Sequence, residues 1–413
     1  MPKIVELTQG LEKYRTDILL LLVGGNPLPN AVAGALLARE ESTVVLVHSR
    51  STCPLAQRLA KLLSGEDGPT CVLVEVKEAN PGDIYGSVHG TLESRWNNSV
   101  AGVGLNYTGG TKAMAVHAYA AVADWARQNQ VTPVLSYLDA STLSLRFAPS
   151  PSAPSGPCDE IRVGTSIRVA LTEMLELHGW KLDSRDPPNP TPRWPKAAEE
   201  LAKILAGEQG WSEYRQWLQK LFRTAGEQDD KTSLHLPDKV ALAPFASAWR
   251  KDLGLAQAAR TLDLGTKEEY RETTRWLEGI WLEQHVLGIL QNLSDSFGLH
   301  ECFQHVAVLD PGTGIHFDLD VVAVRGYQLF VFSCGVSEKR QRLKSKLLEV
   351  AIRARQVGGD EARVALVCGS DEPEDLEKEV RQQLGSDAVR VFGKHHLRDL
   401  ENEVGAWIER AVA

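Results

Sequence analysis

Short apolar runs alternate with amphipathic segments over the first 148 residues. The runs that indicate buried strands are ILLLLV at 18–23, VVLVH at 44–48, CVLVEV at 71–76 and PVLSYL at 133–138. Helical patterns such as NAVAGALLARE and TKAMAVHAYAAVADWARQ lie between them. Strands that alternate with helices predict βαβ units and a mainly parallel sheet. The segment TLSLRF at 142–147 predicts one further strand at the end of this region.

Two proline-rich segments divide the rest of the chain. They are PSPSAPSGPC at 149–158 and DSRDPPNPTPRWP at 183–195, and such a composition favours linkers. Residues 196–290 follow a helical pattern, and we expect their Trp side chains to pack rather than bind. After them come the strands HFDLDVVAV and QLFVFSC, a basic helix and the strand RVALVC. The pattern predicts an α/β protein in three parts, 1–148, 149–265 and 266–413.

Composition narrows the class of protein. No run of 18 apolar residues and no signal-peptide pattern occurs, so we expect no membrane contact and a cytoplasmic location. The six cysteines form no C-x-x-C pair, which indicates reduced thiols rather than zinc or disulfides. A net charge of −9 means that any contact with nucleic acid must be local. The clearest basic stretch, 339–355, is either such a contact or a solvated helix face.

Two glycine-rich loops follow predicted strands at the carboxyl edge of the sheet, where open α/β sheets bind ligands. The first is Gly24-Gly25-Asn26-Pro27, and the second is NYTGGTK at 106–112, which runs into a helix. Adjacent glycines let N–H groups approach a ligand, and a helix N-terminus followed by Lys112 suits phosphate. Neither Walker nor G-x-G-x-x-G spacing is present, so ATP hydrolysis and NAD are not indicated. The alternative is a tight turn followed by a solvated lysine.

Two carboxylates alternate on one of the later strands. Asp318 and Asp320 are two residues apart, so we expect them to face the same side of the sheet. Neighbouring carboxylates repel unless a cation or solvent intervenes, and oxygen-rich sites suit Mg²⁺ or Mn²⁺. The alternative is that both lie on the wet face of an edge strand.

The segment LNYTGGTKAM resembles the signature of the CARF domain, the Rossmann-like sensor of type III CRISPR defence. The loops VGGNPLPN and VVLVHSRST fit the same family in the same order, over roughly residues 15–148. That family dimerises and binds a ring of adenylates, usually four, across its two-fold axis. The resemblance therefore implies a homodimer with cyclic tetra-adenylate as activator. It implies that the ring is lined by Gly25, Asn26, Ser49, Thr52, Thr108, Gly109, Gly110, Thr111 and Lys112.

Residues 276–368 resemble the nuclease domain that accompanies CARF sensors, a variant of the PD-(D/E)xK restriction-endonuclease fold. The matching segments are the helix GIWLE, the strands DLDVV and VFSC, and the helix after them. In such folds acidic residues hold a divalent ion that activates water, and a lysine orients that water. The resemblance implies that Glu283, Asp318 and Asp320 are metal ligands, with the backbone carbonyl of Cys334 as a further candidate.

The family motif is altered at one point. Ser333-Cys334-Gly335 stands where an acid, one residue and a lysine are expected. The lysine could instead come from the following helix, where Lys344 and Lys346 are the candidates. The leading interpretation is a nuclease that cyclic tetra-adenylate activates, that requires Mg²⁺ or Mn²⁺, and that cleaves DNA, RNA or both. The alternative is a sensor whose nuclease fold has lost its chemistry and binds nucleic acid or protein, and in either case the sensor could degrade its own ring.

Overall fold

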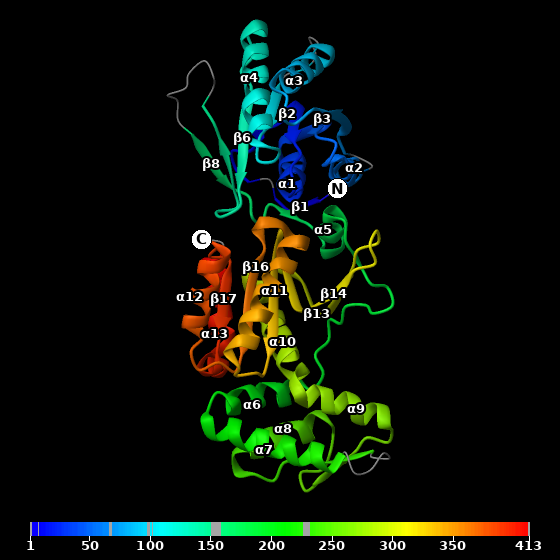
Figure 1. Ribbon diagram of the computed structural model, residues 1–413, viewed down its shortest axis with the longest axis vertical. Helices are drawn as coiled ribbons and strands as arrows, with labels where there is room; N and C mark the ends of the chain where they lie inside the picture. Colours follow the sequence, from blue (N-terminus) through cyan, green and yellow to red (C-terminus); the bar gives the residue numbers. More distant parts are fainter. Residues whose placement is uncertain are drawn as a thin grey trace.

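The computed structural model describes residues 2–6, 8–65, 68–96, 100, 102–149, 158–225 and 232–411. The molecule is elongated, with an N-terminal α/β part at one end, a second α/β part in the middle and a helical part at the other end (Figure 1). No helix within these ranges is long and apolar enough to cross a membrane. The α/β class that the sequence predicts is confirmed.

The N-terminal part is a seven-stranded sheet in the order β4-β3-β2-β5-β6-β7-β8. The first five of these strands are parallel to one another, whereas the pairs β6–β7 and β7–β8 are antiparallel. Apolar side chains of α1 and α2 pack on one face and those of α3 and α4 on the other, which confirms the predicted Rossmann-like arrangement. The elements are β2 (Thr16–Leu22), α1 (Leu28–Leu37), β3 (Ala38–His48), α2 (Cys53–Leu63), β4 (Thr70–Glu75), α3 (Pro81–Arg95), β5 (Val103–Asn106), α4 (Lys112–Asn129), β6 (Val134–Asp139), β7 (Ser144–Phe147) and β8 (Asp159–Arg162).

The predicted boundary after residue 148 is too early. The strand β8 pairs antiparallel with β7, so the N-terminal sheet continues beyond the proline-rich segment. Residues 150–157 of that segment lie outside the described residues. A hairpin loop and a linker have similar compositions, so only the strand pairing distinguishes one from the other. The chain end is tied to the same region, because β1 (Lys3–Ile4) pairs with β9 (Ile167–Arg168).

The central part is a six-stranded mixed sheet in the order β10-β13-β14-β15-β16-β17. The predicted hairpin is confirmed as β14 and β15. The helices α11 and α12 cover one face, and α10 and α13 cover the other. Because β10 belongs to this sheet, the central part begins well before residue 266. Its elements are β10 (Lys181–Leu182), α10 (Trp281–Phe297), β13 (Leu299–Leu309), β14 (His316–Arg325), β15 (Gln328–Gly335), α11 (Arg340–Gly358), β16 (Arg363–Cys368), α12 (Pro373–Leu384), β17 (Val389–Phe392) and α13 (Leu400–Arg410).

The helical part packs around tryptophan side chains, as predicted. The ring of Trp194 lies 5.0 Å from that of Trp276, and Phe245 stacks on Trp249 at 5.3 Å. This core continues into the α10 face of the central sheet. The elements are α6 (Pro195–Leu205), α7 (Glu208–Ala225), β11 (Ser233–His235), α8 (Ala243–Asp252), β12 (Thr261–Asp263) and α9 (Lys267–Arg275).

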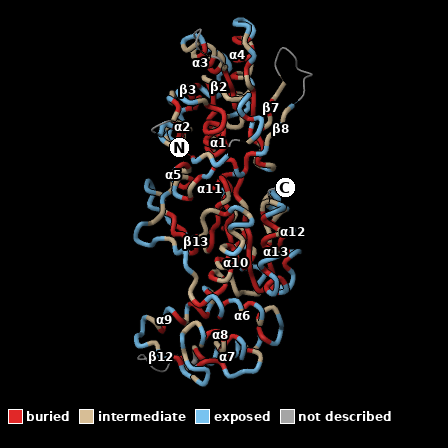
Figure 2. The backbone as a smooth tube through the Cα atoms, turned by 180° about the vertical axis from the view of Figure 1, so that it is seen from behind, coloured by how far each residue is buried: buried red, intermediate tan, exposed pale blue. Residues whose placement is uncertain are grey.

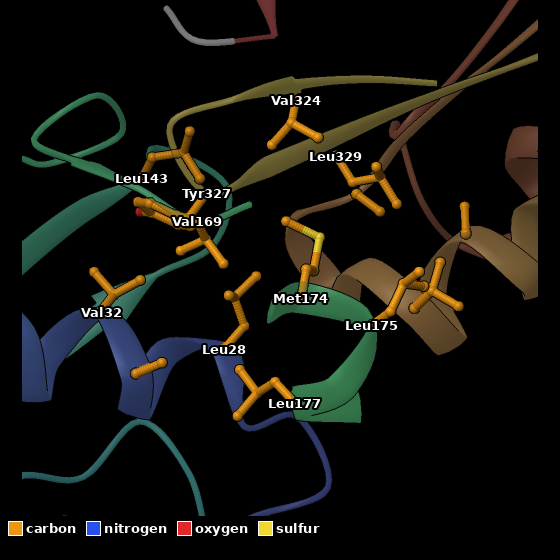
Figure 3. Packing of buried hydrophobic residues seen from close by; sticks show 14 of the residues in the cluster. Leu28, Val32, Leu143, Val169, Met174, Leu175, Leu177, Val324, Tyr327 and Leu329 are labelled. Atoms are coloured by element: carbon orange, nitrogen blue, oxygen red, sulfur yellow. The ribbon is translucent and has the colours of Figure 1, made fainter. Parts of the chain in front are cut away.

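One apolar core joins the N-terminal and central parts. Leu28 of α1 approaches Met174 of α5 (Leu171–His178), and Met174 in turn approaches Leu329 of the central sheet (Figure 3). Val32 of α1 and Val324 of the central sheet belong to the same cluster of buried side chains, and buried segments of both parts meet at this junction (Figure 2). Burying one such side chain contributes about 1.5–3 kcal/mol, so the two parts form a continuous, tightly packed junction.

Candidate functional site

The first candidate site forms where β14 and β15 stop pairing. Asp320 directly precedes Val321, which is the β14 residue farthest from the hairpin turn that still pairs with β15. Its Oδ2 atom accepts hydrogen bonds from the backbone N–H of Cys334 at 2.7 Å and from the hydroxyl of Ser333 at 3.0 Å. The Nζ atom of Lys346 lies 2.9 Å from the same oxygen and also donates to the Cys334 carbonyl. The altered motif and a lysine of α11 therefore converge on one carboxylate.

Lys346 occupies the region that the missing motif lysine would reach. A Cβ atom built on Gly335 would lie 3.9 Å from Lys346 Nζ. Burial lowers the pKa of Lys346, but the Asp320 carboxylate outweighs this effect and the pKa lies above its ordinary value. The ammonium group therefore stays charged at neutral pH. Of the two lysines that the sequence offered, the structure brings Lys346 to the site.

Glu283 completes this group from the opposite face of the sheet. It lies in the first turn of α10, directly after a π-helical turn at Trp276–Ile280. Burial, reinforced by Asp320 and partly offset by Lys346, raises the pKa of Glu283 to about 8. Ionising Glu283 would leave two carboxylates beside one lysine, so the site would then be short of positive charge. A divalent ion with oxygen ligands would balance that charge, so the residues present fit Mg²⁺ or Mn²⁺.

Two of the predicted residues lie elsewhere. The Nζ atom of Lys344 is held 2.6 Å from Glu379 on α12. Asp318 is exposed and makes no hydrogen bond or ion pair within the described part of the chain. The predictions that these two residues serve the site are therefore not supported by its geometry.

The alternation of side-chain directions is not kept at Asp320. Leu319 packs with the cluster under α11, whereas Val321, two residues later, packs with the cluster under α10. On the neighbouring strand, His305 stands opposite Asp320 and has a φ of 52°. This left-handed residue twists the strand pair, and the simple rule that would bring Asp318 beside Asp320 fails there.

A second group of potential metal ligands lies at the start of α12. Atoms of Glu374, His395 and His396 lie within 4.8 Å of one another. The Nδ1 atom of His396 accepts a hydrogen bond from the backbone N–H of Gly393 at 3.0 Å. In the neutral ring the proton is then on Nε2, which has no lone pair for a metal. The Nε2 proton of His396 faces Glu374 at 3.7 Å, so this group fits a polar contact between histidine and Glu374 better than a metal site.

The second candidate site is formed by the two glycine loops of the N-terminal sheet, which lie against each other. A Cβ atom on Gly24 would come 2.7 Å from the backbone nitrogen of Gly110, and one on Gly109 would come 2.2 Å from the carbonyl oxygen of Leu22. Gly110 also has a φ of 76°. A Cβ atom on Gly25 would meet nothing within 4 Å, so this position faces open space. Close approach of the two loops explains why positions 24 and 109 are glycine.

The second loop ends in a capped helix with an exposed cation. The Thr111 side chain accepts a hydrogen bond from the N–H of Met114 and so caps α4. Lys112 is exposed and makes no ion pair in the described ranges. The Thr108 hydroxyl donates to Asn106 and accepts from the N–H of Leu138, both at 2.7 Å. Thr108 therefore shapes the loop, and its single proton is already engaged.

The exits of β3 and β4 line an open pocket of about 710 Å³ beside these loops. Ser49 is buried, and its hydroxyl lies 2.8 Å from that of Ser51. The N–H of Ser49 donates to the Thr52 hydroxyl at 3.0 Å. Arg50 and Lys77 add positive charge to the lining, and Glu75 and Glu78 add an equal negative charge. The pocket therefore has the size for part of a nucleotide, but its lining carries no net positive charge for a phosphate.

Asn26 points away from the glycine loops. Its Nδ2 atom donates to Glu361 Oε2 at 2.9 Å, and its Oδ1 atom lies 3.4 Å from Nε2 of His178. Glu361 is fully buried just after α11, and this burial raises its pKa to about 7, against the opposite effect of the Asn26 hydrogen bond. The Asn26 side chain is therefore engaged with Glu361 and His178, and its contact with the ring stays a prediction. Neither Glu361 nor His178 gave any signal in the sequence.

No family model matches this sequence, and no curated protein matches it. Solved structures do share its fold over nearly the whole chain. Protein VC1899 from Vibrio cholerae is 17% identical with a TM-score of 0.71, covering 95% of this chain and 98% of that one. Can2 from Sulfobacillus thermosulfidooxidans, solved in complex with cyclic tetra-adenylate, is 18% identical with a TM-score of 0.66, covering 96% and 98%. The fold that the resemblance implied is confirmed.

Proposed function

We propose that this protein is a metal-dependent nuclease activated by cyclic tetra-adenylate and acting on DNA, RNA or both. The observation that carries the proposal is the convergence of Glu283, Asp320 and Lys346 on the altered motif. The whole-length likeness to Can2, which was solved with cyclic tetra-adenylate, supports the activator. The activity would belong to type III CRISPR antiviral defence, as the family resemblance implies.

Glu283, Asp320 and the Cys334 carbonyl would hold Mg²⁺ or Mn²⁺. When bound, such an ion stabilises charge on the scissile phosphate and acidifies water. The Ser333 hydroxyl and the Cys334 N–H fix the Asp320 carboxylate by hydrogen bonds. Lys346 would orient the attacking water or neutralise the developing negative charge, the role that the motif lysine has in the family.

The glycine loops would bind the ring. Free N–H groups at the start of α4 and the Lys112 ammonium suit a phosphate. A homodimer would place two copies of the loop around a ring with repeated phosphates, which matches the symmetry of the ligand.

The two sites are joined by α11. Asn26 contacts Glu361 at the C-terminal end of this helix, and Lys346 lies nearer its N-terminal end. A ring that moves the loop at Gly24 and Gly25 would also move Asn26, and α11 would carry that movement to Asp320. This route supports activation, rather than simple binding, as the effect of the ring.

The decisive test incubates plasmid, single-stranded DNA and RNA with the protein and Mn²⁺, with and without cyclic tetra-adenylate. We expect cleavage of at least one substrate, strongly increased by the ring and abolished by Asp320→Asn. Asparagine keeps the shape of the side chain but removes the charge that the ion needs. If all three substrates stay intact with ring and Mn²⁺, the proposal is wrong.

A second function is favoured by Ser333. It replaces the acid of the family motif, so the site has one carboxylate fewer than its relatives in the family. The corresponding hypothesis is a ring-dependent binding module for nucleic acid or protein. Ring-dependent retention of a labelled strand without cleavage would identify it. Degradation of the ring by the sensor is compatible with both functions and is tested by chromatography of the incubated ring.

A further inference from the structure

The N-terminal half of α11 carries basic side chains on two flanks of a buried stripe. On one flank, Arg340 and Lys344 are both held by Glu379 of α12, at 2.9 and 2.6 Å. On the other flank, Lys339 and Arg342 are exposed and make no ion pair or side-chain hydrogen bond within the described ranges. Glu379 therefore neutralises the cations on the first flank, whereas Lys339 and Arg342 have no acidic partner within the described ranges.

Helical spacing puts Arg342 on the same flank as Lys346, because residues four apart share a helix face. Lys339 is the N-cap residue directly before the helix, three positions before Arg342. Because Lys346 contacts Asp320, this flank is the one that leads to the candidate nuclease site. Glu349, three residues after Lys346, is the first acidic residue of this basic stretch.

We propose that Lys339 and Arg342 hold phosphates of the substrate strand beside the Asp320–Lys346 site, which rests on the proposed nuclease function. Like charges three residues apart on a helix repel each other, and the molecule as a whole is acidic. Two neighbouring cations without an acidic partner therefore suit an anionic occupant with repeated charges. A nucleic-acid strand provides such charges, and a guanidinium binds phosphate in a bidentate manner.

We expect Arg342, but not Arg340, to contact phosphate. Arg340 is therefore a matched control on the same helix. With ring and Mn²⁺ present, Arg342→Ala should raise the KM for a single-stranded substrate about tenfold and leave kcat within twofold. Lys339→Ala should act in the same direction. Arg340→Ala removes the same charge from the paired flank, and we expect it to leave KM unchanged. Thermal melting of each variant checks that the fold is intact.

A measurement of binding without turnover tests this proposal independently of the nuclease function. In the Asp320→Asn background, anisotropy of a labelled single strand is measured from 50 to 300 mM salt. Removing one phosphate contact should reduce the slope of log affinity against log salt by about 0.7. A reduced slope for Arg342→Ala supports the proposal even if the wild-type protein cleaves nothing. Equal slopes and affinities for Arg342→Ala, Arg340→Ala and the parent would overturn it and make this flank a solvated helix face.

Discussion

Asn26 Nδ2 lies 2.9 Å from Glu361 Oε2, and this hydrogen bond joins the loop after β2 to the far end of α11. Glu361 is fully buried, and its other carboxyl oxygen has no partner among the described residues. Lys346 lies on α11, about 18 Å along the helix axis from its last residue, Gly358, at 1.5 Å per residue. Leaving a buried carboxyl without its donor costs about 1–3 kcal/mol, so displacement of Asn26 would bias the position of α11.

Asn26→Ala should uncouple the two sites. The side chain faces Glu361 rather than the glycine loops, so the dissociation constant for cyclic tetra-adenylate should stay within threefold. Ring-stimulated cleavage should fall at least tenfold, because a coupling of 1–3 kcal/mol corresponds to about 5–150-fold. Calorimetry and cleavage assays on one preparation measure both. If ring affinity falls in parallel with cleavage, Asn26 contacts the ring after all, as the sequence resemblance implied.

Glu361→Gln should change how stability depends on pH. Burial raises the pKa of Glu361 from 4.5 to about 7 in the folded protein. The folded state therefore favours the protonated acid: its stabilisation is fully present below about pH 4.5 and is lost as the pH rises through about 7. A difference of this size corresponds to on the order of 3 kcal/mol. Glutamine cannot ionise, so the variant should melt several degrees above the wild type at pH 8.5 and at nearly the same temperature at pH 5. Equal melting temperatures of the variant and the wild type at pH 8.5 would contradict a raised pKa of the buried Glu361 carboxyl.

Lys112→Ala should weaken binding of the ring. The residue is the only fully charged side chain in the second glycine loop, and a charge-assisted phosphate contact contributes about 1.5–3 kcal/mol. The dissociation constant should therefore rise roughly 10- to 150-fold. The melting temperature without ring should not change, because Lys112 is exposed. Titration should also give one ring per two chains, and an unaltered affinity would move the ring site elsewhere.

The sequence predicted the parts of the fold that depend on local pattern. Apolar runs such as ILLLLV and the glycine loops led to the correct sheet and to loops that do meet at its edge. The contacts of side chains that link distant segments were harder to predict from the sequence. Asn26 follows a strand at the ligand-binding edge, as a ring contact would, and only the packing of α11 against that loop turns it toward Glu361.

The choice between Lys344 and Lys346 shows the same limit. The two residues are separated by one position on a helix with charges on both flanks of its buried stripe. Their roles depend on the neighbouring elements, Glu379 on one side and Asp320 on the other, and neither can be assigned from helical periodicity. The tertiary fold therefore brings a lysine to the altered motif, which the sequence spacing alone does not reveal.

Lys346→Ala and Lys344→Ala should differ sharply in activity. A lysine that orients water or neutralises charge during the reaction contributes about 100-fold or more in rate. Loss of Lys346 should therefore reduce kcat by at least this factor, whereas loss of Lys344 removes only a partly exposed ion pair and should change kcat less than threefold. Single-turnover cleavage with saturating ring and Mn²⁺ measures the two rates. Similar losses for both variants would argue against a special role for Lys346.

A lysine returned to the family position should rescue the loss of Lys346. Gly335 is a strand residue whose added Cβ would meet only Lys346, at 3.9 Å from Nζ and 4.0 Å from Cδ, which is ordinary van der Waals contact. In Lys346→Ala that space is vacated, and the side chain of Gly335→Lys can extend toward Asp320. We expect the double variant to regain at least tenfold over Lys346→Ala, because the charge returns by the route that the acid-x-Lys motif uses. Gly335→Gln in the same background has similar length without the charge and should not rescue. If lysine and glutamine behave alike, the position of Lys346 reflects packing of α11 and not its chemistry.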